Sequence, residues 1–114
     1  MGAPETRIQN QILRWLADRP YLGRFCRMNS GALRDRKGRL VRYGLPGLSD
    51  IVGILRDGGR VLCVEVKTKT GRQSETQAQF QKMIDSCNGI YILARDVNDL
   101  AATLEPYTRG HGGG

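Results

Sequence analysis

Residues 50–67 read DIVGILRDGGRVLCVEVK, two apolar runs separated by a glycine-rich turn signal. This pattern predicts a β-hairpin. A two-residue turn at Asp57-Gly58 sets the register of its strands and places Asp50 directly opposite Glu65. Lys67 comes two residues after Glu65 and therefore lies on the same face of the strand. The hairpin is thus predicted to hold three charged side chains together at one end.

Both faces of this hairpin are otherwise apolar. One face carries Val52, Ile54, Val61 and Cys63, and the other carries Ile51, Leu55, Leu62, Val64 and Val66. Strands that are apolar on both faces are typical of the middle of a sheet with helices on each side. We therefore expect the hairpin to be central and covered on both faces.

Two carboxylates that meet across a pair of strands repel each other unless a cation lies between them or one of them takes up a proton. Oxygen ligands of this kind suit Mg²⁺ or Mn²⁺. Lys67 would then stand beside the metal, where it could orient or help deprotonate a water or stabilise charge on a phosphate. The purely structural alternative is an ion-pair network in which Lys67 bridges Asp50 and Glu65. The spacing alone leaves both interpretations open.

The rest of the chain predicts an α/β domain with a mixed sheet. Helices are expected over 4–18, from a capping box at 74–77 to Asn88-Gly89, and over 97–104, and strands over 24–29, 39–44, 50–55, 60–68 and 90–93. This α-β-β-β-β-α-β-α order predicts helices packed on a central mixed sheet. We expect a single domain over 1–108 and a disordered glycine-rich tail over 109–114.

Two helix residues are predicted to lie near the charged cluster. Glu5 extends the buried stripe of the first helix, although an acid in the first turn also interacts favourably with the helix dipole. Gln77 extends the buried stripe of the second helix, although the fourth residue of a capping box is also expected to reach back to the Ser74 N–H. Each residue therefore has a structural explanation beside the functional one.

The chain has 114 residues and a formal net charge of +7. A basic balance favours a polyanionic partner, first of all nucleic acid. Basic residues are concentrated over 34–42, where the one acid is Asp35. This stretch either contacts phosphates or is a solvated surface. The three cysteines, Cys26, Cys63 and Cys87, form no metal or disulfide motif.

The sequence shows no targeting or membrane signal. No stretch approaches the roughly 18 consecutive apolar residues of a membrane span. The residues that follow Met1 are too polar for a signal peptide. We therefore expect a cytoplasmic protein with no membrane partner.

The charged cluster has the spacing of a nuclease motif. Asp50…Glu65-x-Lys67 resembles the D…(D/E)-x-K core of the PD-(D/E)XK nuclease superfamily, whose core is restriction-endonuclease-like. The chain also resembles the VRR-NUC subfamily, because it has an acid at the start of the first helix. It shares further short motifs with that subfamily: Arg27-x-Asn29-Ser30-Gly31, Gly47-x-x-Asp50-Ile51, Glu65-Val66-Lys67 and Ser74-x-x-Gln77. The resemblance spans residues 5–95. The chain departs from the subfamily pattern at Ser49, which replaces the proline before the metal-binding Asp. The proline shapes the turn and is not a metal ligand.

The resemblance implies a phosphodiesterase that acts on DNA with Mg²⁺ or Mn²⁺. It implies that Asp50, Glu65 and the Val66 carbonyl hold the metal, with Glu5 as a further candidate ligand, and that Lys67 assists the nucleophile. The predicted catalytic residues are Asp50, Glu65, Lys67, Gln77 and Glu5. Stand-alone members of this size resemble Holliday-junction resolvases in architecture and tend to act as dimers. We therefore expect a homodimer that cleaves four-way junctions and uses no organic cofactor.

Basic and polar residues outside the cluster are predicted to contact DNA: Arg27, Asn29, Arg34, Arg36, Lys37, Arg39, Arg42, Lys69 and Arg72. Contacts to phosphate give strong salt dependence and little sequence readout. Two alternatives remain open. One is a non-catalytic DNA-binding module of the same fold, and the other is a nuclease that cuts ordinary duplex, flap or single-stranded DNA.

Overall fold

The computed structural model of the chain describes residues 4–28, 31–43 and 45–110, and at 31–33, 42 and 43 it describes the backbone only. In chain order its elements are α1 (Pro4–Ala17), β1 (Gly23–Arg27), β2 (Gly31–Arg34), β3 (Leu40–Tyr43), β4 (Ile51–Leu55), β5 (Val61–Val66), α2 (Glu75–Ser86), β6 (Ile90–Ala94) and α3 (Val97–Thr108). The predicted fold class, helices packed on a mixed sheet, is confirmed.

β1, β4, β5 and β6 form a four-stranded sheet in that order. β1 and β5 each pair with β4 in the antiparallel direction, whereas β6 pairs with β5 in parallel. Because parallel neighbours need a crossover connection, α2 joins β5 to β6. β5 is therefore an inner strand, and Leu62 through Val66 are all buried.

The predicted register of the β4–β5 hairpin is confirmed. Ile51 pairs with Val64 and Ile54 pairs with Val61. The same register, continued by one residue, places Asp50 opposite Glu65. The predicted two-residue turn is wrong, because the turn covers residues 56–59 and is closed by the Leu55 N–H donating to the Arg60 carbonyl at 2.8 Å. A four-residue turn withdraws one residue from each strand, so the pairing of the remaining residues is unchanged.

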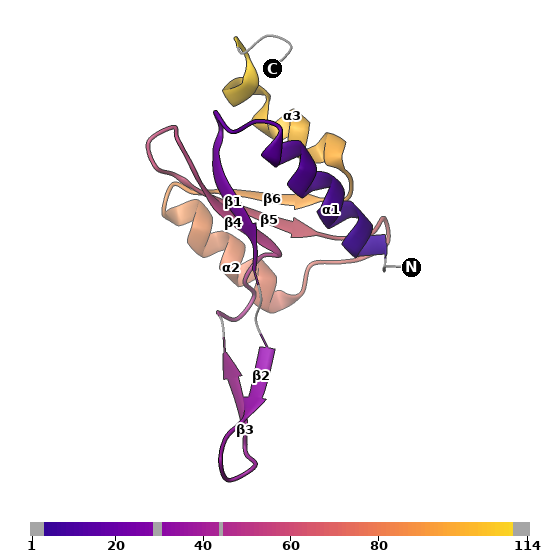
Figure 1. Cartoon of the computed structure of the whole chain (residues 1–114), viewed down its shortest axis with the longest axis vertical. Coiled ribbons are helices and arrows are strands. Elements are labelled where there is room, and N and C mark those ends of the chain that lie inside the picture. Colours follow the sequence, from indigo (N-terminus) through magenta and orange to yellow (C-terminus); the bar gives the residue numbers. More distant parts are fainter. Residues whose placement is uncertain (1–3, 29–30, 44, 111–114) are drawn as a thin grey trace.

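Helices cover both faces of the sheet (Figure 1). α1 and α3 pack on one face, where their apolar side chains meet those of β4, β5 and β6. This main core is formed by Ile12, Leu16, Leu22, Ile51, Leu55, Leu62, Val64, Val66, Ile92, Ala94, Leu100 and Leu104. α2 packs on the opposite face, where Phe80 and Ile84 contact Cys63. None of the described helices is long and apolar enough to cross a membrane.

The face under α2 is covered incompletely. α2 packs against β6 and against Cys63 of β5, whereas Ile54 at the far end of β4 is 59% exposed. The prediction that the hairpin is covered on both faces is therefore correct for β5 and wrong for this end of β4. The physical reason is that a single helix of 12 residues crosses this side of the sheet.

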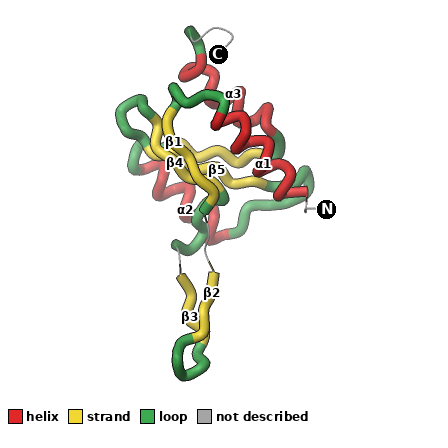
Figure 2. Tube along the Cα trace, viewed as in Figure 1, coloured by secondary structure: helices red, strands yellow, loops and turns green. Residues whose placement is uncertain are grey.

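β2 and β3 form a second, two-stranded sheet that projects from the body of the molecule, and we call residues 31–43 the arm (Figures 1 and 2). Its antiparallel register runs from Gly31 opposite Tyr43 to Arg34 opposite Leu40. The arm contributes to the elongated shape, with extents of 56, 35 and 25 Å. The sequence predicted β3 but not β2, because a four-residue segment that begins with glycine gives a weak strand signal.

Candidate active site

Asp50 lies directly before β4 and is fixed through both its carboxylate and its backbone. Its Oδ2 accepts a hydrogen bond of 2.7 Å from the Val66 N–H on β5. Its backbone carbonyl accepts one of 2.8 Å from the Met28 N–H, just after β1. Glu65, the neighbour of Val66 on β5, is only 3% exposed. The two predicted metal-binding carboxylates are thus set at the ends of adjacent strands.

The turn that leads into Asp50 depends on Gly47, which has a φ of +74°. A Cβ atom at this position would stand 2.4 Å from the carbonyl oxygen of Thr76 in the first turn of α2. Glycine is therefore required both for the backbone conformation and for the close approach to the helix. This contact brings the turn before Asp50 against the end of α2 that carries Gln77.

The side-chain amide of Gln77 makes two contacts of different kinds. Its oxygen accepts a 2.9 Å hydrogen bond from the Ser74 N–H, and the Ser74 hydroxyl oxygen accepts one from the Gln77 backbone N–H. These two hydrogen bonds form the capping box. Its nitrogen donates a 3.0 Å hydrogen bond to Oε2 of Glu65. The sequence predicted two alternative roles for Gln77, one in the helix cap and one beside Glu65. In the structure the oxygen of its amide serves the first role and the nitrogen serves the second.

Lys67 follows β5 and points its ammonium toward Glu65, with 3.8 Å between Nζ and Oε2. Its backbone N–H donates to the Ala94 carbonyl at the end of β6, at 3.0 Å. The loop after it folds back, because a Cβ on Gly71 would lie 3.5 Å from the Lys67 Cβ. The Lys67 side chain is consequently only 16% exposed.

Negative charge is concentrated around Glu65. Burial and, to a smaller extent, the neighbouring Asp50 raise the pKa of Glu65 to about 8, although Lys67 opposes both effects. Glu5 lies exposed in the first turn of α1, and its charge gives a smaller increase in the same pKa. The structure therefore brings Asp50, Glu65, Lys67 and Gln77 into contact and places Glu5 within electrostatic reach.

The donor atoms of this cluster fit a hard divalent cation. Oε1 of Glu65 is buried and has no hydrogen-bond partner among the described residues, an arrangement that is costly unless a cation or a proton neutralises it. Mg²⁺ often binds through one or two carboxylates and completes its shell with water and substrate phosphates. Asp50 and Glu65 match that pattern. Within the described ranges no three acidic, His or Cys side chains converge as a ligand group, so the structure does not place Glu5 as a third ligand.

We predict that Glu65→Gln raises the melting temperature of the metal-free protein near pH 8 more than near pH 4.5. The folded-state pKa of Glu65 is about 8 against an ordinary 4.5, so the folded protein holds an extra proton in that interval. Stability therefore falls as the pH rises through it. Gln does not ionise and removes the effect. We expect a gain of about 1–3 kcal/mol at the alkaline end, the usual cost of a buried polar group without a partner, measured by thermal melts in EDTA.

Glu75→Gln is the matched control, because Glu75 is exposed in the first turn of α2. It should keep the pH dependence of the wild type. A lower melting temperature for Glu65→Gln at every pH would contradict the prediction, and would indicate that Asp50 and Lys67 hold Glu65 in a stabilising ion-pair network.

Arg95, which the sequence did not single out, binds the loop that follows Lys67. Its Nη1 donates to the carbonyls of Thr68 at 2.5 Å, Gly71 at 2.7 Å and Lys69 at 3.2 Å. The signal that could have identified it is topological. The ends of two parallel strands meet at the same edge of a sheet, so the residue after β6 lies beside the segment that follows β5.

We predict that Arg95→Met lowers kcat for the DNA cleavage that the resemblance implies by about ten- to a hundredfold, because small displacements of reacting groups have effects of this size. Without the guanidinium, three loop carbonyls lose their donor. Hydrogen exchange of the amides over 68–72 should therefore become faster. Arg109→Met, at the exposed end of α3, is the control. Unchanged exchange and unchanged kcat in Arg95→Met would contradict a positioning role.

The residues predicted to contact DNA fall into separate groups. Lys69 and Arg72 line a hollow of about 700 Å³ beside Arg95. Arg34, Arg36, Lys37 and Arg39 lie exposed on the arm. Arg27 lies on β1 and donates to Oδ1 of Asn10. Asn29 and the side chain of Arg42 lie outside the described residues.

Comparison with known proteins places these features in a family context. A family model described as the VRR-NUC domain matches residues 3–97. A solved structure described as a "VRR_NUC domain" superposes with a TM-score of 0.65 at 17% sequence identity, over 93% of this chain and 99% of that one. At this identity the structural likeness establishes the fold alone. No match was found among curated proteins.

Proposed function

The chain belongs to the VRR-NUC family and has the PD-(D/E)XK nuclease fold, and from this premise we propose that it is a metal-dependent DNA endonuclease. The observation that carries the proposal is the carboxylate pair Asp50 and Glu65 with the Lys67 ammonium 3.8 Å from Glu65. An ionised Glu65 whose Oε1 has no hydrogen-bond partner among the described residues lowers the stability of the folded protein. Such a destabilising arrangement is expected where the carboxylate has a function, such as binding a metal ion.

Mg²⁺ or Mn²⁺ would be held by Asp50, Glu65 and the Val66 carbonyl, with Glu5 as a candidate for a further contact. When bound, such an ion polarises the scissile phosphate and makes a nearby water more acidic. Oxygen-rich donor sets of this composition favour these ions over softer metals.

The chain's own residues would position the reacting groups. The Val66 N–H fixes one oxygen of Asp50 and the Gln77 amide fixes one oxygen of Glu65, so the remaining oxygen of each carboxylate would be the one to bind the metal. The Lys67 ammonium would orient the attacking water or stabilise charge on the phosphate oxygens. Gln77 acts through Glu65 and is therefore a positioning residue.

The proposed substrate is a four-way DNA junction, and the proposed active form is a homodimer. A twofold dimer presents two sites in the symmetry of such a junction. Self-association could use exposed apolar side chains, since Ile54 is 59% exposed on β4 and Met83 is 44% exposed on α2.

The test is a panel of labelled DNA substrates: four-way junction, flap, linear duplex and single strand, each with Mg²⁺, Mn²⁺ or EDTA. We expect paired cuts in the junction that require a divalent ion. Cleavage of only duplex, flap or single-stranded DNA would support the proposed nuclease activity but contradict the proposed preference for junctions. DNA binding without cleavage of any substrate would overturn the enzyme and favour a non-catalytic binding module.

A further inference from the structure

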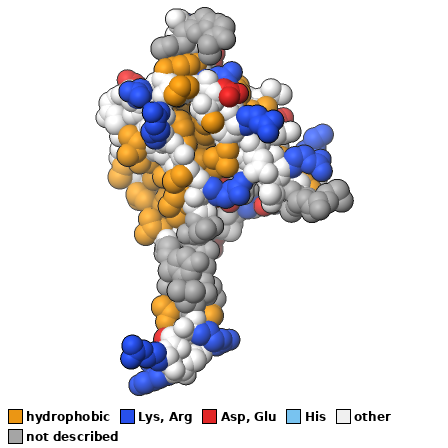
Figure 3. All heavy atoms as spheres, in the orientation of Figure 1, with side chains coloured by type: hydrophobic (Ala, Val, Ile, Leu, Met, Phe, Trp, Pro, Cys, Tyr) orange, Lys and Arg blue, Asp and Glu red, His pale blue; other side chains and the backbone are white. Residues whose placement is uncertain are grey.

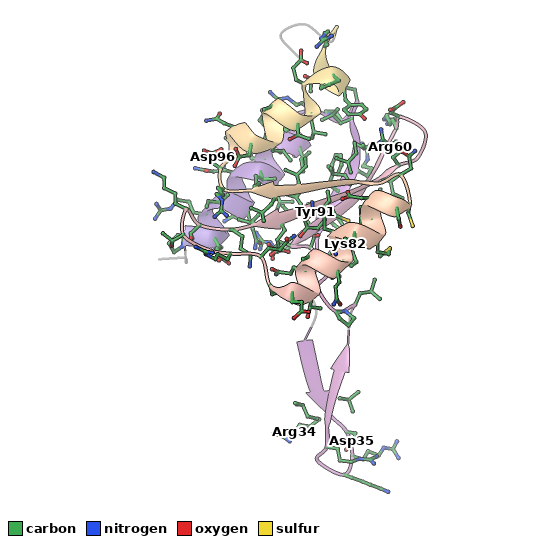
Figure 4. The ribbon with its side chains drawn as sticks, turned by 180° about the vertical axis from the view of Figure 1, so that it is seen from behind. Arg34, Asp35, Arg60, Lys82, Tyr91 and Asp96 are labelled. Atoms are coloured by element: carbon green, nitrogen blue, oxygen red, sulfur yellow. The ribbon has the colours of Figure 1, made fainter. Side chains whose placement is uncertain are left out.

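The free end of the arm carries a concentration of positive charge. Arg34, Arg36, Lys37 and Arg39 are all exposed there, and Asp35 is the one acid among them. Figure 3 shows Lys and Arg side chains gathered at this end, and Figure 4 places Arg34 and Asp35 at the tip, far from Tyr91 in the body. This group of charges is therefore displayed on a projection, away from the body of the molecule (Figure 4).

The turn at the tip is held by its own hydrogen bonds. Oδ1 of Asp35 accepts from the N–H groups of Lys37 and Arg39 at 2.9 and 2.8 Å, and Oδ2 accepts from the Arg39 guanidinium at 2.8 Å. The Arg34 guanidinium donates to the Gly38 carbonyl at 2.8 Å. Asp35 is thus engaged within the turn, whereas Arg36 and Lys37 have their side chains directed to solvent.

Two apolar side chains of the arm are exposed to solvent. Leu40 and Val41 on β3 are 54% and 48% exposed. A two-stranded hairpin that packs on nothing is marginally stable in water. Leu40 and Val41 are therefore available for contact with a partner that would also stabilise the ribbon.

We propose that the arm enters a groove of duplex DNA that flanks the cleaved bond, an inference that rests on the proposed function. The major groove of B-DNA admits a two-stranded β-ribbon. Phosphates line both sides of the groove, so Arg36 and Lys37 at the tip can contact them, and an exposed Leu40 or Val41 can contact a thymine methyl group.

The dimensions of the arm define the required substrate. Four residue pairs and a turn extend roughly 15–20 Å at about 3.3 Å per residue, which corresponds to about five base pairs at 3.4 Å each. The arm contact therefore needs duplex that continues beyond the DNA bound by the body. Each duplex arm of the substrate must be long enough to reach the tip.

The experiment compares DNA binding by two variants in an Asp50→Ala background, without divalent ions. Arg36→Ser/Lys37→Ser removes two tip charges and leaves the hydrogen bonds of the Asp35 turn in place. Lys82→Ser/Arg109→Ser removes the same charge from exposed positions elsewhere. Thermal melts establish that both fold. Because no cleavage is measured, the result is independent of whether the protein proves to be a nuclease.

For junctions with long duplex arms, we expect the tip variant to bind at least about tenfold more weakly than the control and its salt slope to fall by about 1.8. The wild type should gain affinity when duplex arms are lengthened from about five to about fifteen base pairs, and the tip variant should not. Equal affinity and salt slope in the two variants would overturn the proposal. So would loss of self-association by the tip variant in light scattering with DNA affinity equal to the control, which would assign the arm to a second copy of the chain.

Discussion

Asp50→Asn is expected to lower the single-turnover rate of DNA cleavage by about a thousandfold, within the range found when one preorganised electrostatic group is removed. The substitution keeps the shape of the side chain and an oxygen that can accept from the Val66 N–H, so the strand ends should stay in place. What is lost is one of the two charges that would hold the cation. Titration calorimetry with Mn²⁺ should show the corresponding loss of affinity.

Asp57→Asn is the matched control, because Asp57 lies exposed in the turn between β4 and β5, at the end of the hairpin away from the site. It should cleave DNA and bind Mn²⁺ as the wild type does. Equal cleavage by Asp50→Asn and Asp57→Asn would exclude Asp50 from the reaction and, with it, the proposed metal site.

Lys67→Met is expected to lower the cleavage rate by about 10²- to 10⁴-fold, the usual contribution of a group that takes part in proton transfer or orients a water. Met retains much of the stem that lies against Gly71, so the loop should keep its path. Mn²⁺ binding should survive, because the substitution removes a positive charge 3.8 Å from Glu65. The rate is measured at saturating metal and DNA.

The separation of catalysis from metal binding distinguishes this role from an ion-pair network. If Lys67 only neutralised Glu65, its loss would lower the melting temperature of the metal-free protein and leave the metal-saturated rate unchanged. Lys82→Met, on the exposed face of α2, controls for the loss of a lysine.

Local patterns in the sequence were sufficient to place the carboxylates. The hairpin register depends on residues between Asp50 and Glu65 alone, and the capping box on Ser74 and Gln77 alone. The register and the capping box are both confirmed by the backbone pairing and the hydrogen bonds of the folded chain, although the turn has four residues and not the predicted two. The catalytic roles assigned to these residues stay predictions until cleavage is measured.

Features that depend on distant segments were not predictable in the same way. The exposure of Ile54 follows from where α2 crosses the sheet, and the placement of Arg95 follows from the parallel pairing of β5 with β6. Neither is encoded in the spacing of nearby residues. β2 was missed for a different reason, since its four-residue sequence has little strand character by itself.

The double contact of Gln77 has a consequence for which sequences this fold can accept. A capping box is satisfied equally by Gln or Glu at its fourth position, so for helix formation the two residues are synonyms. Next to Glu65, however, Glu would replace an amide donor with a third negative charge. The helix cap alone would therefore accept either Gln or Glu at position 77, whereas the contact with the Glu65 carboxylate accepts only Gln.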